Sequence, residues 1–337
     1  MGKTALITGI TGMVGSHLAD FLLENTDWNI VGMTRWRSPL DNLQHLIGKI
    51  NNGKRISLVY GDLTDPISLE RMASETKFDF VFHLAAQSYP QTSFTAPLDT
   101  FTTNINGTMA LLESIRLHSP NALIHVCSSS EVYGRVPAEF VPINENCSFH
   151  PASPYAISKV GTDLVGRYFA EAYNMDIMCT RMFTHTGPRR GDVFAESTFA
   201  KQIALIEAGF SEPIIKVGNL DSFRTFADVR DAVRAYHMLL TVNPQAGESY
   251  NIGGHHSCTV GEMLDFLISK SSFNGIKIET DPMRLRPIDA DLQVPDSSKF
   301  TNHTGWQPLY TFEQTMEDLL NYWREKIIKD GNSFLMR

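Results

Sequence analysis

The 337-residue sequence has few cysteines and no excess of positive charge. Its four cysteines show no C-x-x-C spacing, so the sequence suggests neither a disulfide framework nor a zinc site. The net charge of -8 argues against a nucleic-acid partner, because such a partner requires a basic face. We therefore expect buried thiols, no metal and no nucleic acid.

Long apolar runs are also missing. No segment reaches the roughly 20 residues that a membrane-spanning helix needs, and the N-terminus has the pattern of a strand rather than of a signal peptide. We therefore expect no membrane association and a cytoplasmic location. Apolar residues still make up 42% of the chain, so it can bury a core and has room for one large or two smaller domains.

Apolar runs and helical stretches alternate from residue 1 to about 180. This alternation predicts an α/β fold with a parallel sheet, helices on both faces and a ligand at the carboxyl ends of the strands. The strands are expected at 4–8, 29–33, 56–60, 78–84, 123–128 and 176–182. The helices are expected at 14–24, 66–75, 100–118 and 154–173.

The pattern changes after about residue 183. Strands become short and scattered, and helices are expected at 194–208, 228–241, 259–270 and 311–328. We expect a domain over residues 1–182 and a smaller C-terminal α/β domain over 183–330, with interleaved segments. A ligand cleft between them follows, because ligand sites favour such interfaces.

Three glycines, Gly9, Gly12 and Gly15, follow the first strand and open a helix. Glycine lets the backbone approach a pyrophosphate, and the helix N-terminus supplies free N–H groups. The spacing is a variant of the G-x-G-x-x-G dinucleotide fingerprint, and an ordinary strand-to-helix turn is the alternative. The residues expected to contact a dinucleotide here are Gly9, Thr11, Gly12, Met13 and Val14.

The end of the second strand lacks the Asp or Glu that would bond the ribose of NAD. Arg35 and Arg37 follow it instead, which favours NADP and leaves NAD as the alternative. If neither arginine binds a cofactor, both arginines are ordinary surface residues. Further dinucleotide contacts are expected after the third strand, at the adenine, and after the fourth, where small residues would let the cofactor lie against the backbone. They are Asp62 and Leu63, then Leu84, Ala85, Ala86 and Gln87.

Hydroxyl groups and a carboxylate, from Ser128 to Glu131, follow the fifth strand. Further on, Tyr155 and Lys159 are four residues apart, so both project from one helix face. An ammonium near a phenol lowers its pKa, which would let Tyr155 exchange a proton near neutral pH. The pair alone would equally describe a solvated helix face.

Taken in order, these motifs resemble the extended short-chain dehydrogenase/reductase family over nearly the whole chain. The resemblance implies a Rossmann domain, doubly wound, that binds a nicotinamide cofactor, and a smaller domain that binds a nucleotide-activated sugar. It also implies a cofactor that stays tightly bound and is regenerated in each turnover, and a homodimer or homotetramer.

Within that family, Ser129, Ser130 and Glu131 resemble the 4,6-dehydratases. Dehydration needs a base for the C5 proton and an acid for the C6 hydroxyl, whereas an epimerase needs neither. The resemblance implies that Tyr155 removes the C4 hydroxyl proton and that Lys159 bonds the cofactor ribose. Glu131 would take the C5 proton, Glu131 or Ser130 would protonate the leaving water, and Ser129 would bond the 4-oxygen.

Further motifs resemble the GDP-mannose 4,6-dehydratases, and this implies a GDP-linked sugar. Arg224 and Arg286 match diphosphate-binding arginines, while His185 and Arg190 match positions near the cofactor. The substrate contacts implied in this way are Ser88, Thr184, Lys201, Arg224 and Arg286.

The sequence departs from that group at Thr184, Thr186 and Thr225, near the sugar. The hexose therefore stays open, and a GDP-linked heptose or N-acetylhexosamine is an alternative. A nucleotide-sugar 4-epimerase or 4-reductase is another. A non-catalytic dinucleotide sensor is a third, although it would have no use for Ser129, Glu131, Tyr155 and Lys159 together.

Overall fold

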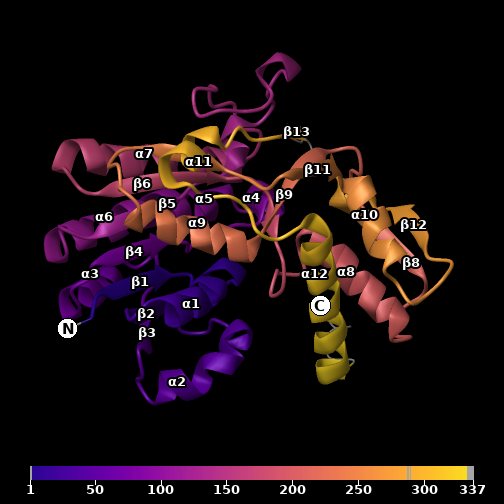
Figure 1. Ribbon diagram of the computed structural model, residues 1–337, viewed down its shortest axis with the longest axis horizontal. Helices are drawn as coiled ribbons and strands as arrows, with labels where there is room; N and C mark the ends of the chain where they lie inside the picture. Colours follow the sequence, from indigo (N-terminus) through magenta and orange to yellow (C-terminus); the bar gives the residue numbers. More distant parts are fainter. Residues whose placement is uncertain (1, 287, 289, 332–337) are drawn as a thin grey trace.

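Seven parallel strands form the main sheet of the computed structural model, which describes residues 2–286, 288 and 290–331 (Figure 1). Their order is β10-β6-β5-β4-β1-β2-β3, so the strand order reverses between β1 and β4. The strands are β1 (Thr4–Thr8), β2 (Asn29–Thr34), β3 (Ile56–Tyr60), β4 (Phe80–His83), β5 (Leu123–Cys127), β6 (Ile177–Met182) and β10 (Ser249–Ile252). The expected doubly wound Rossmann sheet is confirmed, and ligands of such sheets bind where the order reverses.

Helices cover both faces of this sheet. Successive side chains of a strand point to opposite faces, so Ile7 packs in the cluster with α1 (Met13–Asn25) and α9 (Val229–Thr241), while Leu6 packs in the opposite cluster. The helices that contribute to the opposite cluster are α3 (Pro66–Glu75), α6 (Gly107–His118) and α7 (Pro154–Tyr173).

The second part of the molecule, which lies beside the main sheet in Figure 1, has its own apolar core. Its helices are α8 (Ala195–Glu207), α10 (Val260–Ser269) and α12 (Phe312–Asp330). Its strands are β7 (His185–Thr186), β8 (Ile214–Val217), β9 (Phe223–Asp228), β11 (His256–Thr259), β12 (Lys277–Thr280) and β13 (Leu292–Gln293). Shorter α-helices are α2 (Ile47–Asn51), α4 (Pro90–Thr95), α5 (Pro97–Phe101) and α11 (Ser298–Thr304). The 3-10 helices are η1 (Asp41–Leu46), η3 (Ser130–Tyr133), η4 (Ala138–Phe140) and η5 (Pro282–Arg284).

The single helix expected over residues 100–118 is interrupted. A π-helical turn, Thr102–Asn106, separates α5 from α6. The buried Asn104 side chain there accepts from the Gln87 amide at 2.8 Å and donates to the Gln87 carbonyl at 2.9 Å. The irregular turn thus brings a side-chain amide to the loop that follows β4, and π-turns inside helices are frequent near functional sites.

The later half of the chain also contributes to the main sheet. β10 pairs with β6 at one edge, and α9 packs against the same face as α1. Residues 229–252 therefore return to the layer built by the N-terminal residues. The domain division at residue 182 stays a prediction.

Candidate active site

A cleft of about 560 Å³ lies between the carboxyl ends of the main-sheet strands and the second part of the molecule. It gathers most of the residues that the sequence singled out, from elements distant in the chain. The predicted residues that line it are Gly9, Gly12, Met13, Val14, Leu84, Ala86, Ser88, Ser129, Ser130, Glu131, Tyr155, Lys159, Thr184, His185, Arg190, Arg224 and Arg286.

The glycine turn after β1 is tightly packed. Gly9 has a φ of 70°, and a Cβ there would lie 3.0 Å from the backbone of Ala85. A Cβ on Gly15 would lie 2.3 Å from the Gly9 carbonyl oxygen, so the start of α1 can approach β1 only with glycine. Gly12 caps α1 without a side-chain hydrogen bond. The first amides of α1 thus have no partner inside the helix and fit the pyrophosphate of a dinucleotide.

Eight predicted contacts do not line the cleft: Thr11, Arg35, Arg37, Asp62, Leu63, Ala85, Gln87 and Lys201. Arg35 and Arg37 are exposed after β2. Asp62 accepts hydrogen bonds from the amide and hydroxyl of Thr64, at 2.9 and 2.8 Å, and so shapes its own turn. Lys201 forms an ion pair with Asp192 at 2.8 Å. Their roles in binding stay predictions.

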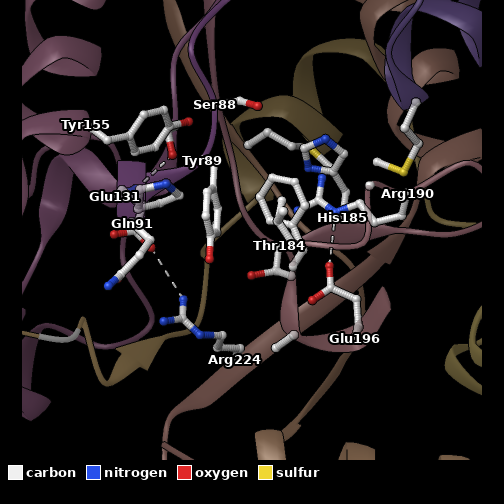
Figure 2. A pocket seen from close by; sticks show the side chains of 18 of the residues that line it. Ser88, Tyr89, Gln91, Glu131, Tyr155, Thr184, His185, Arg190, Glu196 and Arg224 are labelled. Carbon is white, nitrogen blue, oxygen red and sulfur yellow. Dashed lines mark hydrogen bonds and ion pairs between the residues drawn. The ribbon is translucent and has the colours of Figure 1, made fainter. Parts of the chain in front are cut away.

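The residues 128–134, which we call the serine loop, follow β5. Ser129 caps the 3-10 turn η3 (Ser130–Tyr133), and its Oγ accepts the amide of Glu131 at 3.2 Å. The turn ends at Gly134, with a φ of 55°, where a Cβ would collide with the carbonyl of His150. This geometry turns the Glu131 side chain into the cleft, where Figure 2 shows it beside Tyr155.

Tyr155 and Lys159 are buried in the first turns of α7, which Ser153 caps by accepting the Ala156 amide at 3.0 Å. The Lys159 ammonium donates to the carbonyl of Cys127 at 2.7 Å. Burial raises the pKa of the Tyr155 phenol, and a hydrogen bond with Ser129 lowers it in part. Burial lowers the pKa of Lys159.

The Tyr155 pKa is not lowered in this structure, contrary to expectation. Its net shift is upward, because burial is its largest cause, and the effect of Lys159 on it stays a prediction. The positive charge that does lower the Tyr155 pKa comes from Arg190. The spacing of Tyr155 and Lys159 predicted one helix face correctly, but it carried no information about burial.

A second charged group lies across the cleft, beyond Tyr89 in Figure 2. Arg190 Nε lies 3.2 Å from Glu196 Oε1, and the Arg190 guanidinium stacks 3.5 Å from the ring centre of Phe194. Burial and the neighbouring Arg190 charge lower the pKa of His185 to about 4. His185 is therefore a neutral hydrogen-bonding group near pH 7, while Arg190 is the cation of this side.

Arg224 closes the opposite side of the cleft. It lies in β9, and its Nη1 is 3.6 Å from Glu131 Oε1 (Figure 2). Ser88, Thr184 and Arg286 line the same space. The motif that contains Arg286 extends over Pro287 and Asp289, which lie outside the described residues.

Sequence reasoning missed several lining residues, among them Asn42, Tyr89, Phe194 and Glu196. Asn42 donates to the carbonyl of Thr11 at 3.0 Å, and Tyr89 packs edge-on against Phe194. Glu196 is buried in the first turn of α8. Carboxylates are common in the first turn of a helix because they interact favourably with the helix dipole. The local sequence therefore did not mark Glu196 as a residue of the cleft.

Known sequences match this chain over nearly its whole length. A sequence model of the GDP-mannose 4,6 dehydratase family matches residues 6–319. The chain belongs to the GDP-mannose 4,6-dehydratase family. GDP-mannose 4,6 dehydratase 1 of Arabidopsis thaliana is 33% identical over 98% of this chain and 93% of the relative. GDP-6-deoxy-D-mannose reductase of Pseudomonas aeruginosa is 28% identical over 97% and 99%.

Solved structures agree with the fold of this dehydratase-family chain. The structure of RMD from Pseudomonas aeruginosa complexed with NADPH has a TM-score of 0.80 at 27% identity, and covers 96% of this chain and 99% of that one. The dTDP-glucose 4,6-dehydratase of Bacillus anthracis in complex with NAD has a TM-score of 0.82 at 22% identity, over 97% and 98%. Within the part of the chain that the structure describes, no helix is long and apolar enough to cross a membrane.

Proposed function

We propose that this protein is a nucleotide-sugar 4,6-dehydratase, a hydro-lyase, acting on GDP-mannose or a closely similar GDP-sugar. The observation that supports this most directly is Glu131, a carboxylate in the same cleft as the Ser129–Tyr155 hydrogen bond and the glycine turn. The reaction removes one water: the sugar loses the C6 hydroxyl and gains a carbonyl at C4.

Tyr155 and Glu131 carry the proton transfers of this reaction, with Ser129 and Ser130 beside them. Tyr155, as the phenolate, takes the proton of the C4 hydroxyl and becomes the phenol, and its hydrogen bond with Ser129 favours the phenolate form. The C4 carbonyl then acidifies C5, and Glu131 removes the C5 proton. Glu131 or Ser130 protonates the leaving C6 hydroxyl, which departs as water. When the hydride is returned at C6, C5 would regain a proton from Tyr155, which restores the phenolate.

A bound nicotinamide cofactor would accept the hydride of C4 and donate it at C6. The first amides of α1 fit its pyrophosphate, and Lys159 would bond its ribose. Relatives in the solved structures hold NADPH or NAD. We propose NADP here, because no carboxylate ends β2 and the exposed Arg35 and Arg37 follow it.

A 4-reductase is the second candidate, because a GDP-6-deoxy-D-mannose reductase is among the relatives. A reductase would use Tyr155 and Lys159 but has no C5 proton to remove, and Glu131 favours the dehydratase for that reason. A 4-epimerase is disfavoured on the same ground.

We further propose a homodimer or homotetramer in the cytoplasm. The helices α6 and α7 carry apolar side chains that are 46–53% exposed: Met109, Leu117, Ile157, Leu164 and Tyr168. A face of this kind is typical of a protein–protein contact. The molar mass in solution, measured by light scattering, tests the assembly.

The first experiment is to incubate the purified protein with GDP-mannose, without added cofactor, and to analyse the product by mass spectrometry. Loss of one water supports the dehydratase with a retained cofactor, and Tyr155→Phe should abolish it. If GDP-mannose is unchanged but another GDP-sugar loses water, the sugar assignment changes. If no GDP-sugar loses water and a 4-keto-6-deoxy GDP-sugar is reduced with NADPH, the reductase replaces the dehydratase.

A further inference from the structure

We propose that Arg224 holds the carboxylate of Glu131 until the diphosphate of a nucleotide sugar takes the guanidinium, so that substrate binding releases the base for the C5 proton. The inference rests on the proposed function, because it assigns a regulation to the same site. It makes Arg224 a positioning residue for Glu131 in addition to a predicted diphosphate ligand.

The contact joins the two parts of the molecule. Glu131 lies in the serine loop, whereas Arg224 lies in β9 of the second part. Arg224 Nη1 and Glu131 Oε1 are 3.6 Å apart, and the two side chains are 14% and 15% exposed. Figure 2 shows this contact as a dashed line, with Tyr155 next to Glu131.

Both ends of the contact have fixed backbones. Arg224 is registered between Cys258 of β11 and Gln293 of β13. The amide of Glu131 is held by Ser129 Oγ at 3.2 Å, and that hydroxyl also bonds Tyr155. Exchange of the contact therefore needs only side-chain rotation, and the carboxylate released is next to the proton-transferring phenol.

The Arg224–Glu131 contact is also the kind that a diphosphate can displace. At 3.6 Å it is longer than the roughly 2.7–2.9 Å of a charge-assisted hydrogen bond. A diphosphate offers more charge and several oxygens to the planar guanidinium, which pairs with phosphates through two parallel N–H bonds. Arg286 lines the same cleft as a further cation. The diphosphate therefore binds the Arg224 guanidinium more strongly than the single Glu131 carboxylate does, and displaces it.

The test is a double-mutant cycle on the binding of GDP, measured by calorimetry at fixed ionic strength on the protein as purified with its cofactor. GDP carries the diphosphate but not the hexose, so the cycle needs no turnover. Glu131→Gln removes the competitor and should tighten GDP binding about fivefold, the upper range for a partly exposed ion pair. Arg224→Ala removes a charged hydrogen-bond donor and should weaken GDP binding about tenfold or more.

The GDP affinity of the double variant decides between two explanations. If Glu131 acts through Arg224, Glu131→Gln has no effect on GDP binding once Arg224 is alanine. Equal tightening in both backgrounds would show direct repulsion between Glu131 and the diphosphate, and would overturn the inference. So would a single Glu131→Gln variant that binds GDP as the unaltered protein does.

Two variants serve as controls. Glu196→Gln removes the other buried carboxylate of the cleft, which pairs with Arg190, and its effect on GDP binding should add to that of Arg224→Ala. Arg224→Lys keeps the charge and should restore part of both the GDP affinity and the coupling to Glu131. If GDP-mannose loses water but the cycle is additive, only this inference fails. If the protein neither binds GDP nor converts a GDP-sugar, the proposed function itself fails.

Discussion

The two sides of the serine loop satisfy their polar groups in different ways. Behind the loop, Arg181 donates to both carboxylate oxygens of Asp163, at 2.9 and 3.0 Å, and to the hydroxyl of Tyr133 at 3.0 Å. In front of it, the Glu131 carboxylate has a longer contact with Arg224, at 3.6 Å. The two ion pairs therefore have different roles. The Arg181–Asp163 pair holds the loop in place, whereas the Arg224–Glu131 pair keeps hydrogen-bonding capacity for a ligand.

The largest effect expected from this comparison is on catalysis. Glu131→Gln should lower kcat about 10²- to 10⁴-fold, the range for loss of a general acid–base group. It should leave the free energy of unfolding unchanged within about 0.5 kcal/mol, because the side chain is not part of the rear network. Turnover of GDP-mannose and urea unfolding measure the two quantities.

A solvent-isotope experiment gives this variant a sharper outcome. In heavy water, the unaltered protein should place deuterium at C5 of the product, and Glu131→Gln should do so about 10²- to 10⁴-fold more slowly. Deuterium at C5 that appears at the unaltered rate in the variant would assign the base to another group.

The matching change behind the loop should have the opposite effect. Asp163→Asn leaves the buried Arg181 without its counter-charge, so the free energy of unfolding should fall by about 3–5 kcal/mol. Urea unfolding measures this loss, and kcat of the folded fraction is the companion value. A variant of full stability with lost turnover would break the comparison, because it would place Asp163 in the chemistry.

Buried histidines behind the cleft should make the protein sensitive to acid. Burial lowers the pKa of both His83 and His125 to about 3. Below about pH 6.5 the unfolded chain takes up protons at these positions that the folded chain refuses, so stability should fall as the pH drops from 6.5 toward 3. Each histidine contributes a slope of about 1.4 kcal/mol per pH unit in the free energy of unfolding.

His125→Phe isolates one of these contributions. The ring lies 4.3 Å from Tyr236 and its Nε2 is 2.8 Å from Thr180 Oγ1, so the variant loses one hydrogen bond at every pH. The slope between pH 4 and 6 should nevertheless decrease by about 1.4 kcal/mol per pH unit. An unchanged slope would show that His125 already accepts a proton in the folded protein.

Local patterns in the sequence predicted the front of this site better than its back. The glycine turn at Gly9 and the spacing of Tyr155 and Lys159 depend on neighbours in the chain, and the structure places them where these patterns indicate. β10 was missed because four residues, Ser249–Ile252, are too few to show a period, and only their pairing with β6 makes them a strand. The direction of the Tyr155 pKa shift was not predicted, because burial, its largest cause, is a property of the whole fold.

The same reasoning explains the buried network. Arg181, Asp163, Tyr133 and Asn251 come from four separate elements, and each alone resembles an ordinary surface residue in the sequence. Only the packing of α7 and the serine loop against β6 and β10 brings them together. Long-range polar networks of this kind produce no periodic pattern in the sequence, so they cannot be predicted from it.

The smallest effect is expected at the residue that joins the two sides. Tyr133 donates to Asn251 Oδ1 at 2.8 Å and accepts from Arg181, and it follows Glu131 by two positions. Tyr133→Phe leaves both buried partners one bond short, so the free energy of unfolding should fall by about 1–3 kcal/mol.

The kinetic companion of this change distinguishes support from chemistry. kcat should fall less than tenfold, because the hydrogen bond of Ser129 with Glu131 still positions the base. Tyr60→Phe is the matched control, since Tyr60 is 52% exposed at the end of β3; its stability should change by less than about 0.5 kcal/mol. A loss of turnover at Tyr133 as large as at Glu131 would show that the rear network sets the position of the base, and the two sides of the loop would then be one functional unit.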